Sequence, residues 1–290
     1  MNKYKTTLTL TILNEKDIAG LIALSASIGW DYDEHEIRTV MSSGKIVGHK
    51  CEEGQIVSCA AIIPYEGNLA SIGMVIVNQE YRGQGLGKDA TQMCIDYVTE
   101  KTSTMLIATP EGKPLYEIMG FKEVTSVHKF ICTTYKPANL KPPGDFSFRV
   151  EELKEIDIDE VINIDNNAFG VFRRKLLTAR VRQAHQALVI KDSTARVIGY
   201  GLSILGPVNL ILGPIVAPNT KIAEYLINEL AKSHHGKLRI DVPDGTEGII
   251  DFLTKRGFDN VSNPPVMIKN SNDMPKRNGH LYGIAAQIFG

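Results

Sequence analysis

The segment from Ile72 to Met93 constrains the fold of this 290-residue chain more than any other. An apolar, β-branched run at 72–77 is followed by glycines at positions 83, 85 and 87, and then by apolar residues spaced for one helix face. This order predicts a buried strand, a glycine-rich turn and a helix. The N–H groups of such a turn have no helical partner and lie beside the positive end of the helix dipole. We therefore predict an anion site suited to a pyrophosphate.

The spacing of the glycines excludes two common phosphate motifs. The dinucleotide fingerprint needs G-x-G-x-x-G, whereas these glycines occupy alternate positions. A P-loop needs Ser or Thr after its lysine, and Lys88 is followed by Asp89. What remains is R-x-x-G-x-G, which begins at Arg82. A turn without a ligand is disfavoured, because each glycine costs a helix about 1 kcal/mol relative to alanine.

Together with its strand and helix, the R-x-x-G-x-G run resembles the coenzyme A loop of the GNAT acetyltransferases. The resemblance implies acetyl-CoA as the cofactor and an α/β fold, with a central mixed sheet flanked by helices. In that fold two parallel strands splay apart, and the pantetheine arm pairs with one of them like an added strand. The residues implied for the pantetheine are Val75, Ile76 and Val77, and those implied for the pyrophosphate are Arg82, Gly83, Gln84, Gly85, Leu86, Gly87 and Lys88.

A weak internal repeat predicts two copies of this fold. Asp17-Ile18 recurs as Asp157-Ile158, and Gly120-Phe121 near the end of the first half recurs as Gly257-Phe258. Three prolines and a glycine lie in the stretch between the halves, which predicts an extended linker. We expect an N-terminal GNAT domain at 1–136, a Pro-rich linker at 137–146 and a C-terminal GNAT-like domain at 147–290. Residues 121–124 and 127–133 are expected to be the closing strands of the first domain.

The second copy differs from the first where the chemistry is expected. Arg82 and the three glycines have no counterpart in the segment 212–223, although Lys221 still offers a positive charge. We therefore predict a degenerate copy, which makes the whole chain similar to tandem GNAT proteins with a divergent C-terminal domain. The motifs that carry this second resemblance include Asp165 to Gly170, Arg173-Arg174, Gly213-Pro214, Asp241 to Pro243 and Tyr282 to Ala286.

The resemblance also implies a catalytic residue, Tyr116. This residue lies in a segment similar to the family's L-Y-x-x-x-G-F run, where a tyrosine reaches the sulfur and can protonate the departing thiolate. The equivalent residue of the second half is Leu253, which indicates that only the first half is catalytic. A backbone N–H near Val75 would polarise the thioester carbonyl.

The general base is not visible in the sequence. Many GNAT enzymes carry a glutamate on the splayed strand, where this chain has Gly73 and Met74. Trp30 either walls the acceptor pocket or plugs the domain. We select Trp30 and Glu66 as the candidate residues for binding the acceptor substrate. The other residues expected near its rim are Asp31, Asp33, Glu34 and His35.

Composition excludes several classes of protein. The net charge is −1 and there is no long basic run, which argues against a nucleic-acid partner. No apolar run approaches the length of a membrane span. The four cysteines have neither metal-ligand spacing nor a CxxC pair, so we expect no metal site and a reducing, cytoplasmic location.

We predict an N-acetyltransferase that moves the acetyl group of acetyl-CoA to a primary amine of a small molecule or amino acid derivative, by direct attack. Two alternatives stay open. A protein-lysine acetyltransferase would have an open groove in place of a closed pocket. A non-catalytic acyl-CoA sensor would bind the cofactor without turnover. The sequence does not identify the acceptor amine, and it leaves open whether two copies form a homodimer.

Overall fold

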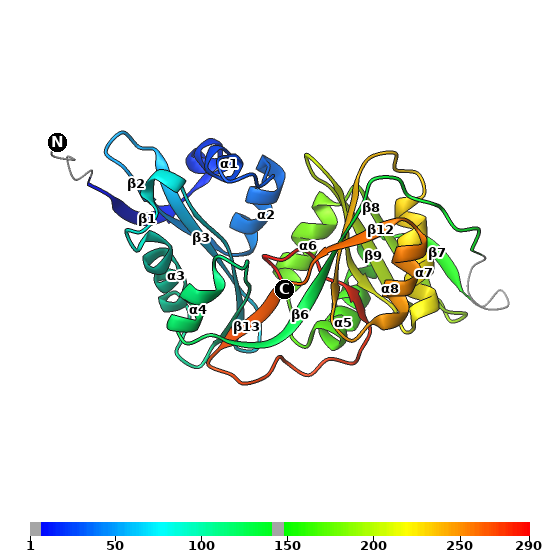
Figure 1. The fold of residues 1–290 in the computed structure, drawn as a ribbon. Coiled ribbons are helices and arrows are strands. Elements are labelled where there is room, and N and C mark those ends of the chain that lie inside the picture. Colours follow the sequence, from blue (N-terminus) through cyan, green and yellow to red (C-terminus); the bar gives the residue numbers. More distant parts are fainter. Residues whose placement is uncertain (1–6, 141–147) are drawn as a thin grey trace.

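The computed structural model describes residues 7–140 and 148–290, and it shows two halves built from the same order of elements (Figure 1). The N-terminal half contains β1 (Thr9–Leu13), α1 (Ile18–Ala26), α2 (Glu34–Ser43), β2 (Lys45–Lys50), β3 (Ile56–Pro64), β4 (Leu69–Val77), α3 (Leu86–Asp96), β5 (Ser103–Ile107), α4 (Lys113–Ile118) and β6 (Lys122–Cys132). The C-terminal half contains β7 (Arg149–Glu152), α5 (Ile158–Phe169), α6 (Arg174–Gln183), β8 (Gln186–Lys191), β9 (Val197–Leu205), β10 (Leu210–Val216), α7 (Thr220–Ala231), β11 (Leu238–Pro243), α8 (Glu247–Lys255), β12 (Phe258–Ser262), β13 (Pro265–Lys269) and β14 (Leu281–Gly283).

The repeat seen in the sequence extends to individual ion pairs. Asp17 ends a short 3₁₀ turn before α1, and its carboxylate lies 2.5 Å from the amine of Lys50 at the end of β2. Asp157 occupies the same place before α5, 2.8 Å from Lys191 at the end of β8. Each aspartate also accepts the N–H group three residues before it, which closes the turn in the same way in both halves.

The two halves exchange strands within one continuous sheet. Its order is β1-β2-β3-β4-β5-β13-β6-β11-β10-β9-β8-β7, with β12 also paired to β6 and β14 to β10. The strand β13 comes from the end of the chain, yet it lies between β5 and β6 of the N-terminal half. In return, β6 runs on into the C-terminal half and pairs with β11 and β12 (Figure 1).

The prediction of two separate closing strands at 121–124 and 127–133 was therefore wrong. A single strand, β6, spans both segments. Its first part pairs with β13 up to Ser126, and its second part pairs with β11 from Val127. The physical reason is that Thr125-Ser126, which separate the two runs, contain neither glycine nor proline to reverse the chain.

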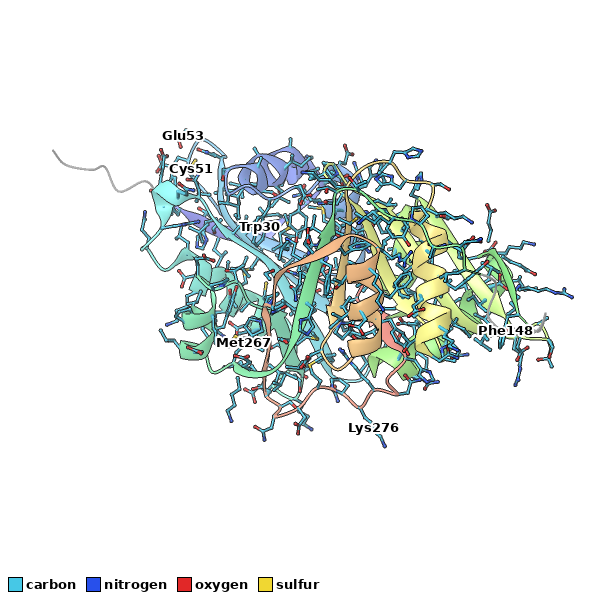
Figure 2. All side chains as sticks on the ribbon, turned by 45° about the vertical axis from the view of Figure 1, so that its right-hand side comes forward. Trp30, Cys51, Glu53, Phe148, Met267 and Lys276 are labelled. Carbon is cyan, nitrogen blue, oxygen red and sulfur yellow. The ribbon has the colours of Figure 1, made fainter. Side chains whose placement is uncertain are left out.

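The exchange buries residues of each half in the core of the other. Met267 of β13 is fully buried in the N-terminal half, in one cluster with Ala90 of α3 and Phe121 (Figure 2). The ranges expected for the two domains, 1–136 and 147–290, therefore do not divide the sheet cleanly. Of the expected linker, residues 141–146 lie outside the described part, while Ala138 donates its N–H to Asn228 of α7 at 2.8 Å.

Helices cover both faces of each half of the sheet. In the N-terminal half α3 and α4 pack on one face, and α1 and α2 pack on the other. In the C-terminal half α7 and α8 lie opposite α5 and α6. The α2 helix contacts α6, and the apolar residues at 284–286 and 288–289 are buried in the core that these two layers share.

Candidate active site between the two halves

The β4 strand separates from its parallel neighbour β5 halfway along its length. Pairing between them ends at Ile72 and Leu106. Directly afterwards β4 carries a bulge, since Gly73 lies opposite Ala61 but Ile76 already lies opposite Cys59. Met74, inside the bulge, has a positive φ of 52°. From Gly73 onward the strand therefore offers an edge that β5 does not pair, which is the geometry needed to accept an extended ligand.

The glycine-rich turn presents a row of unused N–H groups. No acceptor among the described residues receives the backbone N–H of residues 83–88, and α3 begins at Leu86. Gly83 and Gly85 have φ values of +78° and +83°, and a Cβ added at either would meet nothing within 4 Å. The turn is thus exposed, open above its backbone, and located at the positive end of a helix. These features fit a pyrophosphate.

Tyr116 lies on α4, packed edge-on against Phe121 with the ring centroids 6.0 Å apart. Its side chain is nearly buried in the cluster beneath α3 and α4. Burial raises the pKa of this phenol to about 12, with a smaller contribution from Cys94. The hydroxyl therefore stays protonated at physiological pH and is available as a hydrogen-bond donor.

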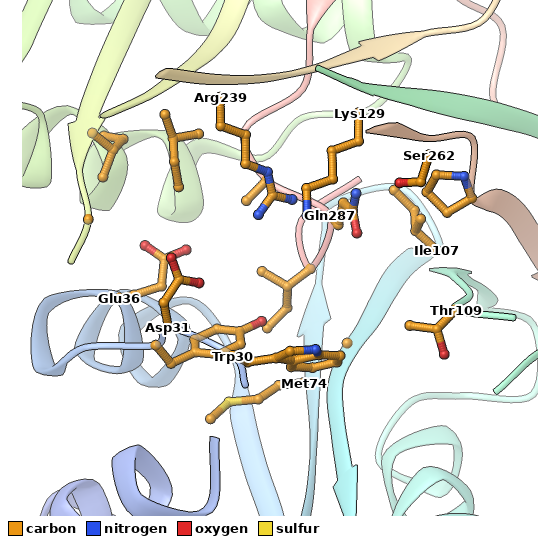
Figure 3. Close-up of a pocket in the computed structure, with 18 of the residues that line it drawn as sticks. Trp30, Asp31, Glu36, Met74, Ile107, Thr109, Lys129, Arg239, Ser262 and Gln287 are labelled. Carbon is orange, nitrogen blue, oxygen red and sulfur yellow. The ribbon is translucent and has the colours of Figure 1, made fainter. Parts of the chain in front are cut away.

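A cavity of about 400 Å³ lies where the open edge of β4 meets the C-terminal half (Figure 3). Gly73 and Met74 of β4 and Thr109 after β5 line its N-terminal side. Lys129 of β6 and Arg239 of β11 line the opposite side. The last segment of the chain closes it with Ala286, Gln287 and Ile288. The site is therefore built by both halves, at the position where the sheet crosses from one to the other.

The acceptor-side residues expected from the sequence fall into two groups. Trp30 lines the cavity, as do Asp31 and Asp33, of which Asp33 accepts the Glu36 N–H at 2.8 Å and so caps α2. Glu66 does not line this cavity. It lies in the turn after β3, where its N–H donates to Phe172. Glu34 and His35 do not line it either.

No pattern in the sequence pointed to the basic side of the cavity. Lys129 and Arg239 are distant in the sequence, and they meet because β6 and β11 are neighbours in register, with Asp241 opposite Lys129. Arg239 donates its Nε–H to Asp241 at 2.8 Å, and Gln287 donates to the same carboxylate at 2.8 Å. Only the strand exchange brings this part of β6 into the C-terminal half.

One fully buried arginine, Arg180 of α6, ties the walls of the cavity together. It donates to Glu36 of α2 at 2.5 Å and to the backbone oxygen of Ala285 at 2.7 Å. Its guanidinium also lies over the ring of Phe289, 4.8 Å from the centroid. This side chain thus contacts both helical layers and the last segment of the chain.

The equivalent gap of the C-terminal half is filled by the chain itself. Pairing between β10 and β11 ends at Ile211 and Arg239, and β10 then carries a bulge between Leu212 and Ile215. In place of an open edge, β14 pairs with β10 at Ile215 and Val216. The next residue, Ile284, donates its N–H to the backbone oxygen of Asp241 at 2.9 Å, and Asp241 lies on β11, the other strand of the gap.

Two further differences separate this gap from its N-terminal equivalent. Pro214 occupies the bulge position that Val75 occupies in β4, and proline has no N–H to donate. The helix that follows, α7, is capped by Asn219, which accepts the Ile222 N–H at 3.1 Å. In the second half the bulge N–H is therefore absent, and the Ile222 N–H at the start of the helix is already paired.

Comparison with known proteins agrees with this geometry. Sequence profiles of the acetyltransferase (GNAT) domain match residues 30–131 and, separately, residues 161–283. A Bacillus subtilis (strain 168) protein, described as the uncharacterized N-acetyltransferase YitH, is 35% identical over 96% of this chain and 97% of its own. The chain belongs to the GNAT acetyltransferases. It is a tandem member of the family, with one such domain in each half.

Solved structures show the same fold. A Pyrococcus horikoshii protein considered to be an acetyltransferase superposes with a TM-score of 0.81, at 20% identity, over 100% of this chain and 98% of that one. A tandem GNAT protein from the clavulanic acid biosynthesis pathway superposes with a TM-score of 0.67, at 13% identity, over 91% of this chain and 98% of its own. The α/β fold predicted from the sequence is confirmed. None of the helices in the described ranges has the length and apolar character needed to cross a membrane.

Proposed function

We propose that this acetyltransferase moves the acetyl group of acetyl-CoA to a primary amine of a small molecule held in the cavity between the halves. The observation that carries the proposal is the position of that cavity, which opens onto the unpaired edge of β4 and is closed by the C-terminal half. A pocket with walls on several sides favours a small acceptor. A protein-lysine acetyltransferase would instead need a groove along which a peptide chain can pass.

The N-terminal half holds the cofactor in this proposal. The bare N–H groups of residues 83–88 and the charge of Arg82 bind the pyrophosphate, and the edge at Val75, Ile76 and Val77 pairs with the pantetheine arm. When bound, acetyl-CoA supplies a thioester as the acetyl donor. The C-terminal half binds no second molecule, because β14 already occupies the corresponding edge of β10.

The acceptor amine has to lose a proton before it attacks, since a free alkylamine has a pKa near ~10.4. Asp31 lines the cavity and has no hydrogen-bond partner among the residues that the structure describes. Its carboxylate attracts the ammonium form and receives the proton directly or through water. No carboxylate can take the place of Gly73, because even a Cβ there would lie 2.9 Å from the Cα of Ile288.

Tyr116 stabilises the departing thiolate. Its pKa of about 12 exceeds the ~8.5 of an ordinary thiol, so the phenol donates a hydrogen bond rather than giving up its proton completely. The N–H of Val75, at the bulge, is the donor that we propose for the thioester oxygen. Neither group has an equivalent in the C-terminal half, where Leu253 and Pro214 occupy the corresponding positions.

An assay of coenzyme A release over a panel of small amines and lysine peptides tests the proposal. We expect turnover of at least one small amine and none of the peptides. Tyr116→Phe should lower kcat by about 10- to 100-fold while leaving the affinity for acetyl-CoA unchanged. A protein that binds acetyl-CoA but turns over no amine would be a sensor, and peptide turnover above that of small amines would favour a protein-lysine acetyltransferase.

A further inference from the structure

The charges that line the cavity indicate a second group on the acceptor. Lys129 and Arg239 project from one side, and Asp31 and Glu36 lie on another (Figure 3). Glu36 is already held by Arg180 at 2.5 Å and by Gln183 at 2.9 Å. Asp31 has no such partner in the described part of the chain, so it is the carboxylate that remains available to a ligand.

The basic side carries one uncompensated positive charge. Asp241 is almost completely buried and pairs with the Nε–H of Arg239 at 2.8 Å. Lys129 lies opposite Asp241 in the strand register, but no salt bridge or hydrogen bond to its amine is found among the described residues. Lys129, Arg239 and Asp241 therefore carry a net charge of +1 on this side of the cavity, and Asp31 on the other side is a further carboxylate that attracts both cations.

A half-buried ammonium that makes no direct ion pair with the described residues, and shares the attraction of Asp241 with Arg239, is unfavourable in the protein alone. Burial lowers the pKa of Lys129 and repulsion by the neighbouring Arg239 lowers it further, and the smaller attractions of Asp241 and Asp31 do not offset them. An anionic ligand would relieve both effects. The terminal N–H groups of Arg239 are available to the same ligand, since only its Nε–H is engaged by the described residues.

We propose that the acceptor is an amine that also carries a carboxylate, bound by Lys129 and Arg239 while its amino group faces Asp31. This inference rests on the proposed function and names the class of its acceptor. A single positive charge matches a monoanionic carboxylate better than a phosphate dianion, and two oxygens suit an ammonium and a guanidinium together. Trp30 and Met74 add apolar surface to the wall of the cavity, on the side away from Lys129 and Arg239 (Figure 3).

The test compares matched acceptors that differ only in the anionic group. Coenzyme A release is measured with the standard L-amino acids and with short ω-amino acids, each beside its amide, at saturating acetyl-CoA. We expect at least one acid to exceed its amide by 10-fold or more in kcat/KM. Turnover of amides alone would overturn this inference but leave the proposed function intact. Failure of every amine, with acetyl-CoA still bound in calorimetry, would overturn the proposed function as well.

Two substitutions at Lys129 test whether this residue binds the carboxylate of the acceptor or takes part in the chemical step. Lys129→Met keeps an unbranched side chain, one atom shorter, and removes the charge, so we expect KM for the acid to rise by about 10- to 100-fold with kcat changed less than about threefold. Lys129→Glu should reverse the preference between the acid and its amide. A fall in kcat without a change in KM would overturn the anchoring role.

Lys122→Glu is the matched control. It makes the same charge change on β6, at an exposed position that does not line the cavity. We expect it to leave the preference between acid and amide unchanged. An equal shift of that preference in the control would show that net charge, and not a contact in the cavity, decides the choice of acceptor, and it would overturn the proposal.

Discussion

The gap beside β4 and the gap beside β10 are equivalent features of the two halves. The first is open, and the second is filled by the chain itself. Both follow the last pair of a parallel ladder, and both begin at a bulge of one extra residue. Beside β4 the edge stays open and the next helix begins with bare N–H groups. Beside β10 the edge is paired with β14 and the next helix is capped by Asn219.

The comparison teaches that a binding site is a place where the chain leaves its own backbone unsatisfied. Unpaired N–H groups and free strand edges cost stability, and proteins normally pair them. The second half pairs them with residues of its own chain. The first half keeps them for a ligand, and the tail that fills the second gap continues at Gln287 and Ile288 to line the cavity.

The largest expected effect is the loss of acetyl-CoA binding by the N-terminal half, where the edge of β4 is open. Gly85→Glu puts a bulky anion where the pyrophosphate would bind, so acetyl-CoA affinity should fall by about 1000-fold or more in calorimetry. Gly245→Glu is a matched control, because both glycines have φ of +83° and neither has an atom within 4 Å of an added Cβ.

The wild-type protein should bind one molecule of acetyl-CoA per chain in the same titration. A stoichiometry of two would contradict the view that β14 closes the second gap. Equal loss of binding in Gly245→Glu would mean that strain or charge alone, and not the position of Gly85, explains the effect.

A smaller effect is expected when the filled gap is disturbed. A Cβ at Gly213 would lie 2.1 Å from the backbone oxygen of Ile284, so Gly213→Ala must displace the segment that follows β14. We expect a loss of about 2–3 kcal/mol in the free energy of unfolding, measured by urea denaturation. Gly20→Ala is the control, because the three atoms nearest an added Cβ there all belong to the Ile56 side chain and none to the backbone. Its effect should be neutral or slightly stabilising. A stable Gly213→Ala variant would show that the contact is not needed.

The smallest effect concerns a feature that the two halves share. Although burial opposes it, hydrogen bonds from Lys50 to Asp17 and from Lys191 to Asp157 lower the pKa of both carboxyl groups. A pKa lowered by folding stabilises the protein above the unfolded value of ~3.9, and this gain is lost as the pH falls through the folded value. Asp17→Asn and Asp157→Asn should each cost about 1 kcal/mol at pH 7 and progressively less in acid.

Urea unfolding of both variants as a function of pH measures this prediction. Because the halves exchange β6 and β13, we expect one cooperative transition that either substitution shifts by a similar amount. Two separate transitions, with each variant affecting only one of them, would show that the halves unfold independently in spite of the exchange.

Local patterns in the sequence were enough to predict the tandem fold and its glycine-rich turn. Strand, turn and helix at 72–93 depend on neighbouring residues, and the structure has β4 and α3 there. Gly120, one half of the repeated Gly-Phe pair, follows the C-cap of α4 with a positive φ of 88°, a backbone conformation that favours glycine there. The carboxylate expected at Glu66 lies outside the cavity, since the distance between two loops is not encoded in either of them.

The sequence by itself determined the order of elements, the anion-binding turn and the loss of that turn in the second half, because each depends on contacts between residues close in the chain. Only the tertiary structure decided which strands pair. Strand ladders are held by backbone groups that every residue carries. The sequences of β6 and β13 therefore do not predict which strands they pair with. That pairing brings Lys129 beside Arg239 and opposite Asp31, and so creates a cavity that neither half contains alone.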